Sequence, residues 1–277
     1  MSTLADIYHP ITATPFTDTE EYCEIPPCKA LKPYICCFWG TKHPVKAISD
    51  GSQGIIIPDT CMDIIFDINY THNSYISCFC GIDDRSFTSI GDGSGDMVAT
   101  FAIRFYPWAA ILFSDCQLSG SKNQFLPTEQ FFSKLKTQLE PLLFEAPTLR
   151  EKAAAAEHYL LRSLCKDHIN NDLMNSVHYM ISSCGRAKIS DICARSVISE
   201  RQLERIFDHN IGISPKTFSS LIRYQLLWQE MVFSNSFNIL DAVEKYGYTD
   251  QAHLLNDFRK RHTMSPTAAV KLANLRR

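Results

Sequence analysis

The chain lacks a long apolar run and lacks the motifs of common enzyme classes. Its longest apolar stretch, residues 97–113, is interrupted by Arg104 and Pro107, so it falls short of the ~20 apolar residues that a membrane-spanning helix needs. The first ten residues carry no basic cluster followed by an apolar segment, which excludes a recognisable signal peptide. G-x-S-x-G, GxGxxG and P-loop patterns are absent. We therefore expect a cytoplasmic protein that is not an enzyme and does not enter a membrane.

Patterns that bind metal ions are also missing. Although the sequence contains 11 cysteines, no two form a C-x2-C pair, which argues against a structural zinc site. The early histidines, His9, His43 and His72, are isolated from one another and cannot form the H-x-H group of a metal-dependent barrel enzyme. The sequence thus predicts no catalytic residues, no cofactor and no metal site, with most cysteines serving as small core residues.

The charge is unevenly distributed along the 277 residues. Residues 169–277 carry a net charge of +4 and residues 1–168 a net charge of −7. An acidic part joined to a basic part is typical of a nucleic-acid-binding module attached to a second module.

The hydrophobic period changes once along the chain, from two to 3.6 residues. Short β-branched and aromatic segments, separated by turn residues, predict strands near residues 31–39, 54–57, 62–68, 75–80, 86–90 and 98–105. Helical spacing then predicts helices at 128–144 and 148–166, with Pro141 and Pro147 as breakers. Further helices are expected near 170–183, 189–195, 199–209, 215–234, 239–246, 250–261 and 266–274. We expect an α+β protein of two domains: an antiparallel β-barrel (1–127) followed by linker helices (128–168), then an all-α domain (169–277).

A short helical unit occurs twice in the all-α region, with an offset of 51 residues. Leu203 and Phe207 recur as Leu254 and Phe258, and Ser214-Pro215 recurs as Ser265-Pro266. Each unit has a helix, a tight break and a second helix, at about 189–209 and 239–261, which is the helix-turn-helix arrangement. The helix expected at 215–234 would span ~30 Å, close to one turn of DNA. The repeat therefore predicts a protein that contacts duplex DNA at two successive places.

The exposed side chains of these units have the chemistry of base and phosphate contacts. Arginine can bond bidentately to guanine, glutamine or asparagine to adenine, and glutamate can accept from cytosine. The phosphate-contact candidates are Lys216, Arg223, Arg259, Lys260 and Arg261.

Residues 170–270 resemble the AraC/XylS family of bacterial transcription regulators. The resemblance rests on Ile198–Phe207, Gly212–Pro215, Gly247–Gln251 and Phe258–Lys260. It implies a double helix-turn-helix whose second helices enter successive major-groove segments. By position, the implied base-reading residues are Arg201, Glu204, Arg205, Gln251, Ala252, His253 and Asn256. Val197 stands where the family usually has glycine, so we expect strain in the first turn, and Thr263 replaces the glycine before the second Ser-Pro.

The amino-terminal half is similar to a sensor domain found in some regulators of this family, through residues 31–39, 57–66 and 103–109. The similarity implies a cupin-like barrel that binds a small effector. Aromatic and charged residues on its expected strands are the candidate pocket lining: Trp39, Asp63, Phe66, Arg104 and Trp108. Asp63 and Arg104 lie in the middle of strands, so we expect them either to pair with each other or to hold a ligand.

The expected partners are double-stranded promoter DNA, a small-molecule effector, a second copy of the chain and, for an activator, RNA polymerase. The helices at 128–168 can form the dimer interface or pack on their own barrel. Two other hypotheses for the front domain remain open. It can respond to thiol oxidation or metal through Cys36, Cys37, Cys78 or Cys80, or it can mediate association without any ligand.

Overall fold

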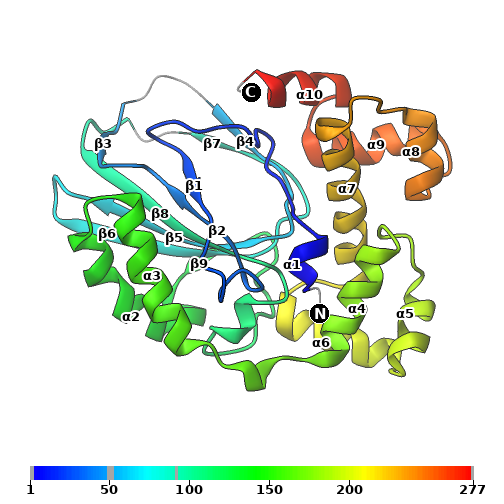
Figure 1. The fold of residues 1–277 in the computed structure, drawn as a ribbon, viewed down its shortest axis with the longest axis horizontal. Helices are drawn as coiled ribbons and strands as arrows, with labels where there is room; N and C mark the ends of the chain where they lie inside the picture. Colours follow the sequence, from blue (N-terminus) through cyan, green and yellow to red (C-terminus); the bar gives the residue numbers. More distant parts are fainter. Residues whose placement is uncertain (1–2, 49–52, 91–92, 276–277) are drawn as a thin grey trace.

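An antiparallel β-domain and a helical domain lie side by side in the computed structural model, which describes residues 3–48, 53–90 and 93–275 (Figure 1). In these residues the larger sheet has seven strands in the open order β1-β2-β8-β5-β6-β9, with β3 also paired to β8, and β4 pairs with β7 in a separate ribbon. The strands are β1 (Cys23–Ile25), β2 (Ile35–Gly40), β3 (Val45–Lys46), β4 (Gln53–Ile56), β5 (Met62–Asn69), β6 (Ser74–Cys80), β7 (Phe87–Ile90), β8 (Met97–Phe105) and β9 (Phe125–Pro127). All pairings are antiparallel, as expected, but the described strands form an open sheet rather than a closed barrel.

Two helices, α2 (Glu129–Glu145) and α3 (Leu149–Ser163), cover one face of the large sheet (Figure 1). The alternation of β5 directs Ile64, Phe66 and Ile68 to this face, where they are buried. Phe79 of β6 contacts Phe132 of α2 at a ring separation of 4.8 Å. This aromatic layer holds the sheet and the linker helices together as one core.

Pro141 does not end a helix, contrary to expectation. It lies inside α2, which continues to Glu145, and the backbone instead departs from helical geometry at Phe132 (φ −137°, ψ 46°). Pro147 lies in the break between α2 and α3, as predicted. The apolar side chains of α2 fill the aromatic core beneath the sheet, so tertiary packing keeps the helix intact around the proline.

The helical domain closely matches the predicted segments. Its helices are α4 (Asn171–Ser182), α5 (Ile189–Ser196), α6 (Glu200–Ile211), α7 (Pro215–Phe233), α8 (Ile239–Tyr246), α9 (Gln251–His262) and α10 (Pro266–Asn274). Shorter helical turns occur earlier in the chain, at α1 (Leu4–Ile7), η1 (Ala110–Leu112) and η2 (Lys166–His168). The α7 helix stands between the two helix-turn-helix units, with α6 at one end and α9 at the other (Figure 1).

Candidate functional site

The first helix-turn-helix unit consists of α5 and α6. The Ser199 hydroxyl accepts a hydrogen bond from the backbone amide of Gln202 (3.2 Å), which fixes the start of α6. Leu203, Ile206 and Phe207 are buried, and this buried stripe leaves the opposite face of α6 in solvent. The predicted base-reading residues on that face are all exposed: Arg201, Glu204 and Arg205.

The second unit, α8 and α9, repeats this construction. Gly247 takes the left-handed conformation (φ 67°) that the predicted turn requires, and Asp250 Oδ1 accepts from the backbone amide of His253 (2.7 Å). Leu254 and Phe258 are fully buried. The four candidates predicted to read bases are exposed: Gln251, Ala252, His253 and Asn256.

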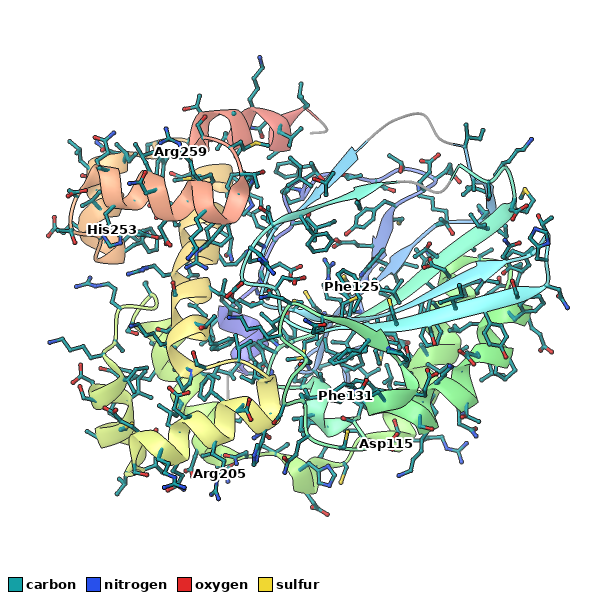
Figure 2. The ribbon with its side chains drawn as sticks, turned by 180° about the vertical axis from the view of Figure 1, so that it is seen from behind. Asp115, Phe125, Phe131, Arg205, His253 and Arg259 are labelled. Atoms are coloured by element: carbon teal, nitrogen blue, oxygen red, sulfur yellow. The ribbon has the colours of Figure 1, made fainter. Side chains whose placement is uncertain are left out.

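The connecting helix α7 sets the spacing of the two exposed faces. Its 19 residues, at about 1.5 Å per residue, give a length of ~28 Å, which is comparable with the ~34 Å repeat of the major groove. Figure 2 shows Arg205 at one end of this arrangement and His253 and Arg259 at the other.

The predicted phosphate contacts do not share one environment. Lys216, Arg259 and Lys260 are exposed, and the half-buried Arg223 lies over the ring of Tyr248 (4.5 Å from its guanidinium carbon to the centroid). Arg261 is a correction, because only 7% of it is exposed. Its Nη2 donates to Ser220 Oγ (2.6 Å) and Asp257 Oδ1 (3.2 Å), so its charge ties α9 to α7 inside the domain.

A groove of about 810 Å³ runs along the exposed face of α6. Arg201, Glu204 and Arg205 line it, together with Lys122 from the β-domain. Lys122 Nζ lies 2.5 Å from Asp84 Oδ2. The β-domain therefore borders the exposed face of α6, which could not be seen in the sequence.

A charged cluster occupies the face of the large sheet opposite α2 and α3. Trp39 Nε1 donates to Asp63 Oδ1 (2.7 Å), and Arg104 Nε donates to the same oxygen (3.1 Å), so the predicted pairing of Asp63 and Arg104 is present. Arg104 Nη1 also lies 3.6 Å from Asp59 Oδ2. Burial raises the pKa of Asp59 to about 6, although Arg104 opposes the shift.

The remaining two pocket candidates, Phe66 and Trp108, do not reach this cluster. Phe66 lies three residues after Asp63 on β5. Because successive side chains of a strand point to opposite faces of the sheet, Phe66 faces the core beneath α2 and α3, where it is only 1% exposed. Trp108 is buried against Tyr106 (centroids 4.8 Å apart), and its Nε1 donates to the carbonyl of Pro33 (3.0 Å). Both predictions are wrong because these rings fill core positions.

Sequence reasoning missed three members of the cluster: Tyr22, Glu24 and Asp59. The Tyr22 hydroxyl donates to Glu24 Oε1 (2.5 Å), and Glu24 lies opposite Trp39 in the pairing of β1 with β2. Because β1 contains only three residues, it has no detectable alternation. Asp59 follows Pro58 in a predicted turn, and only the fold brings it to Arg104.

The sequence also gave no sign of the contacts that join the two domains. The Gln225 side chain of α7 is fully buried and bonds to the backbone of the β-domain: its Oε1 accepts from the amide of Ile11 (2.9 Å), and its Nε2 donates to the carbonyls of Ile11 (3.1 Å) and Pro58 (2.7 Å). Trp228 Nε1 donates to the carbonyl of Thr12 (3.0 Å).

A second contact joins the β-domain to the end of α6. The backbone amide of Leu118 donates to the carbonyl of His209 (2.8 Å), and Ser119 Oγ donates to Asp208 Oδ2 (2.8 Å). Two separate places on the helical domain, in α6 and in α7, thus touch the β-domain.

Within the described ranges, no three or more His, Cys, Asp or Glu side chains are grouped so that they could hold a metal ion. Over the same ranges, no helix combines the length and apolar character needed to cross a membrane.

Comparisons with known proteins distinguish the two parts of the chain. Residues 192–271 match a family of helix-turn-helix domains, and residues 23–127 match a domain family of unknown function (DUF6597). No curated protein matches the chain.

Among solved structures, the chain is similar to ToxT from Vibrio cholerae (11% identity, 85% of this chain and 98% of ToxT covered, TM-score 0.43). It is also similar to a regulator with an AraC-type DNA-binding domain from Chromobacterium violaceum (20% identity, 37% and 91% covered, TM-score 0.34). A third similar structure is the C-terminal domain of AraT from Geobacillus stearothermophilus (19% identity, 38% and 87% covered, TM-score 0.35).

Proposed function

We propose that this chain is a DNA-binding regulator of the AraC/XylS type, and that its helix-turn-helix domain binds promoter DNA with α6 and α9 in successive segments of the major groove. One observation carries the proposal: the exposed faces of α6 and α9 are held at opposite ends of α7, about one turn of DNA apart.

In this proposal the two reading helices use different chemistry. Arg201 and Arg205 on α6 bond to guanine, and Glu204 accepts from cytosine. On α9, Gln251 and Asn256 bond to adenine, His253 donates to a base edge, and the methyl group of Ala252 makes an apolar contact. The phosphate contacts that set the register are Lys216, Arg223, Arg259 and Lys260.

The β-domain controls this binding, in our proposal, by taking up a small-molecule effector. The cluster of Trp39, Asp63 and Arg104 combines an aromatic ring with fixed charges, as effector sites commonly do. The contacts of Gln225 with Ile11 and Pro58 give an effector-dependent change a path to α7. An effector that binds one arrangement of the two domains more tightly would shift the protein toward that arrangement. The shift in this equilibrium, and hence in DNA affinity, is limited by the difference between the effector's binding free energies for the two arrangements.

We further propose that two copies associate through the outer surface of α2 and α3. Most apolar residues of α2 are buried under its own sheet, but Leu142 remains exposed beside a groove that Tyr159 and Arg162 of α3 also line. A dimer would present four reading helices to DNA, and an activating dimer would also contact RNA polymerase.

The DNA proposal is tested on the full-length protein with duplexes selected from a random pool. Arg205→Ala should weaken binding to the selected duplex by ~1–3 kcal/mol, and the loss should be confined to one base position. Lys46→Ala, which removes an exposed positive charge on β3 of the β-domain, is the control and should bind as the parent does. An unchanged footprint and affinity for Arg205→Ala would remove Arg205 from the base-reading residues.

The effector arm of the proposal is tested with a thermal-shift screen of small molecules on the same protein. A ligand that stabilises the parent, loses its effect in Trp39→Ala and alters affinity for the selected duplex supports the proposal. A ligand that binds the cluster and leaves DNA affinity and transcription unchanged contradicts it.

A further inference from the structure

The loop that precedes β9 packs directly against the end of α6. The backbone amide of Leu118 donates to the carbonyl of His209 (2.8 Å). Ser119 Oγ donates to Asp208 Oδ2 (2.8 Å). Gly212, which follows α6, has a positive φ of 78°, and a Cβ added there would lie only 2.7 Å from the carbonyl oxygen of Leu118. The loop of the β-domain and the end of α6 therefore meet with no room for a side chain between their backbones.

Lys122 lies in this loop and lines the groove along the exposed face of α6. Its Nζ is 2.5 Å from Oδ2 of Asp84, a residue between β6 and β7. Asn123 exchanges two hydrogen bonds with the same aspartate: its Nδ2 donates to Asp84 Oδ1 (3.0 Å), and its Oδ1 accepts from the backbone amide of Asp84 (2.9 Å). These contacts fix the segment that carries Lys122, while 37% of the lysine side chain stays exposed.

The groove has a net positive charge only because Lys122 lines it. Its positive residues are Lys122, Arg201 and Arg205, and its negative residues are Glu204 and Asp208. The part of the lining that the helical domain contributes thus carries as many negative as positive charges. The β-domain supplies the excess positive charge, and this is the charge that attracts the phosphate backbone of DNA.

We propose that Lys122 binds a phosphate of the DNA backbone beside the major-groove segment that α6 enters, so that the β-domain forms part of the DNA-binding surface. This inference rests on the function proposed above and adds a contact from outside the helix-turn-helix domain. A lysine ammonium binds phosphate as a point charge, and such a contact adds affinity without reading the base sequence. The ion pair with Asp84 is compatible with this role, because it is partly exposed and therefore weak, and because the ammonium has three donors to share.

The test is the salt dependence of binding by the full-length protein to the duplex selected for the parent. Each phosphate contact adds about 0.9 to the slope of log affinity against log salt concentration. Between about 50 and 200 mM salt, the parent should therefore lose about three to four times more affinity than Lys122→Gln. Lys42→Gln is the matched control and should keep the parent's slope. Lys42 belongs to the same domain, is 34% exposed and pairs with Asp18 (2.9 Å), but it lies beside the start of α3.

Further variants separate a phosphate contact from a structural role. Asp84→Asn removes the ion pair but keeps an oxygen that can accept the hydrogen bond from Asn123, and it should bind the duplex at least as tightly as the parent. Lys122→Arg keeps the charge and should retain the parent's slope. The affinity lost in Lys122→Gln should be the same for the selected duplex and for an unrelated one, whereas Arg205→Ala should affect mainly the selected duplex.

Three results would overturn the inference. Equal slopes for the parent and Lys122→Gln would show that Lys122 does not contact a phosphate. An equal loss of affinity in Asp84→Asn would show that Lys122 acts only by holding its loop in place. A loss confined to one base position would make Lys122 a base-reading residue. In each case a parent that binds the selected duplex and depends on Arg205 leaves the proposed function intact, whereas a parent that binds no duplex would overturn both.

Discussion

His262 is a fully buried histidine in the core of the second helix-turn-helix unit. Its ring stacks on Phe258 (centroids 4.9 Å apart), and Nδ1 shares a hydrogen bond with the hydroxyl of Tyr224 (2.8 Å). Nε2 is buried and has no partner among the described residues. Burial lowers the pKa of His262 to about 4, because a charged imidazolium would lose its hydration there.

This histidine should make the helical domain sensitive to acid. In the unfolded chain His262 takes up a proton near pH 6.5, whereas in the folded chain it stays neutral until about pH 4. The contribution of neutral His262 to the free energy of unfolding is therefore fully present above pH 6.5. This contribution is lost as the pH falls toward 4, by about 1.4 kcal/mol per pH unit. Between pH 6.5 and 5, the parent should lose ~2 kcal/mol more unfolding free energy than His262→Gln.

Denaturant unfolding at several pH values measures this difference, with His168→Gln at an exposed position as the control that keeps the parent's pH dependence. Asp59 and Asp83 contribute with the opposite sign. Burial raises their pKa values to about 6 and about 7, so they bind protons in the folded state first and favour folding as the pH falls below 7. Equal pH slopes for the parent and His262→Gln would contradict the prediction.

At the scale of the helical elements, the turns between helices rely on left-handed residues that are not always glycine. The second unit has Gly247 at this turn, but the first unit has Val197 (φ 54°), and Thr263 (φ 59°) stands before the second Ser-Pro. A left-handed conformation costs an L-residue about 1–2 kcal/mol, and β-branching adds to the crowding. The strain expected at Val197 is therefore present in the structure.

Replacing this valine with glycine should stabilise the helical domain. Val197 is 89% exposed, so Val197→Gly removes little packing while it relieves the backbone. We expect an increase in unfolding free energy of about 1 kcal/mol, measured by denaturant or thermal unfolding. The matched control is Val270→Gly inside α10, where the same substitution should destabilise because glycine lowers helix propensity. A loss of stability in Val197→Gly would show that the valine is not strained.

At the scale of the whole molecule, the two domains are joined by buried polar contacts as well as by apolar packing. Gln225 satisfies both backbone groups of Ile11 and the carbonyl of Pro58. Nearby on α7, Phe233 meets Phe16 of the amino-terminal segment edge to face (5.8 Å). Because unsatisfied buried backbone groups are costly, these hydrogen bonds favour one relative placement of the two domains.

Removing the Gln225 amide should loosen this placement. Gln225→Leu keeps most of the side-chain volume but removes the partner of the buried Pro58 carbonyl and of the part-buried amide and carbonyl of Ile11, at a cost of about 1–3 kcal/mol. Hydrogen exchange of the amide of Ile11 should accelerate by about ten-fold or more. Gln229→Leu is the control on the same helix, since the Gln229 amide nitrogen has no partner among the described residues. Unchanged exchange in Gln225→Leu would mean that the apolar contacts alone hold the domains.

The sequence by itself determined the helical segments, the repeated unit and the left-handed turns. These features depend on neighbours a few residues apart: the stripe of Leu203 and Phe207, the capping residues Ser199 and Asp250, and the missing Cβ of Gly247. Local periodicity records such contacts directly. The longer antiparallel strands of the β-domain were also predictable, but β1, β3 and β9 were not, because two or three residues are too few to show alternation.

Only the tertiary structure decided which side chains face one another across the molecule. Arg261 looks like a phosphate contact in the sequence but is buried between α7 and α9, and Phe66 lies on the opposite side of the sheet from Asp63. The contact of Gln225 with Ile11 joins residues more than two hundred positions apart. Such contacts depend on how sheets and helices pack, and a single sequence carries no periodic signal of that packing.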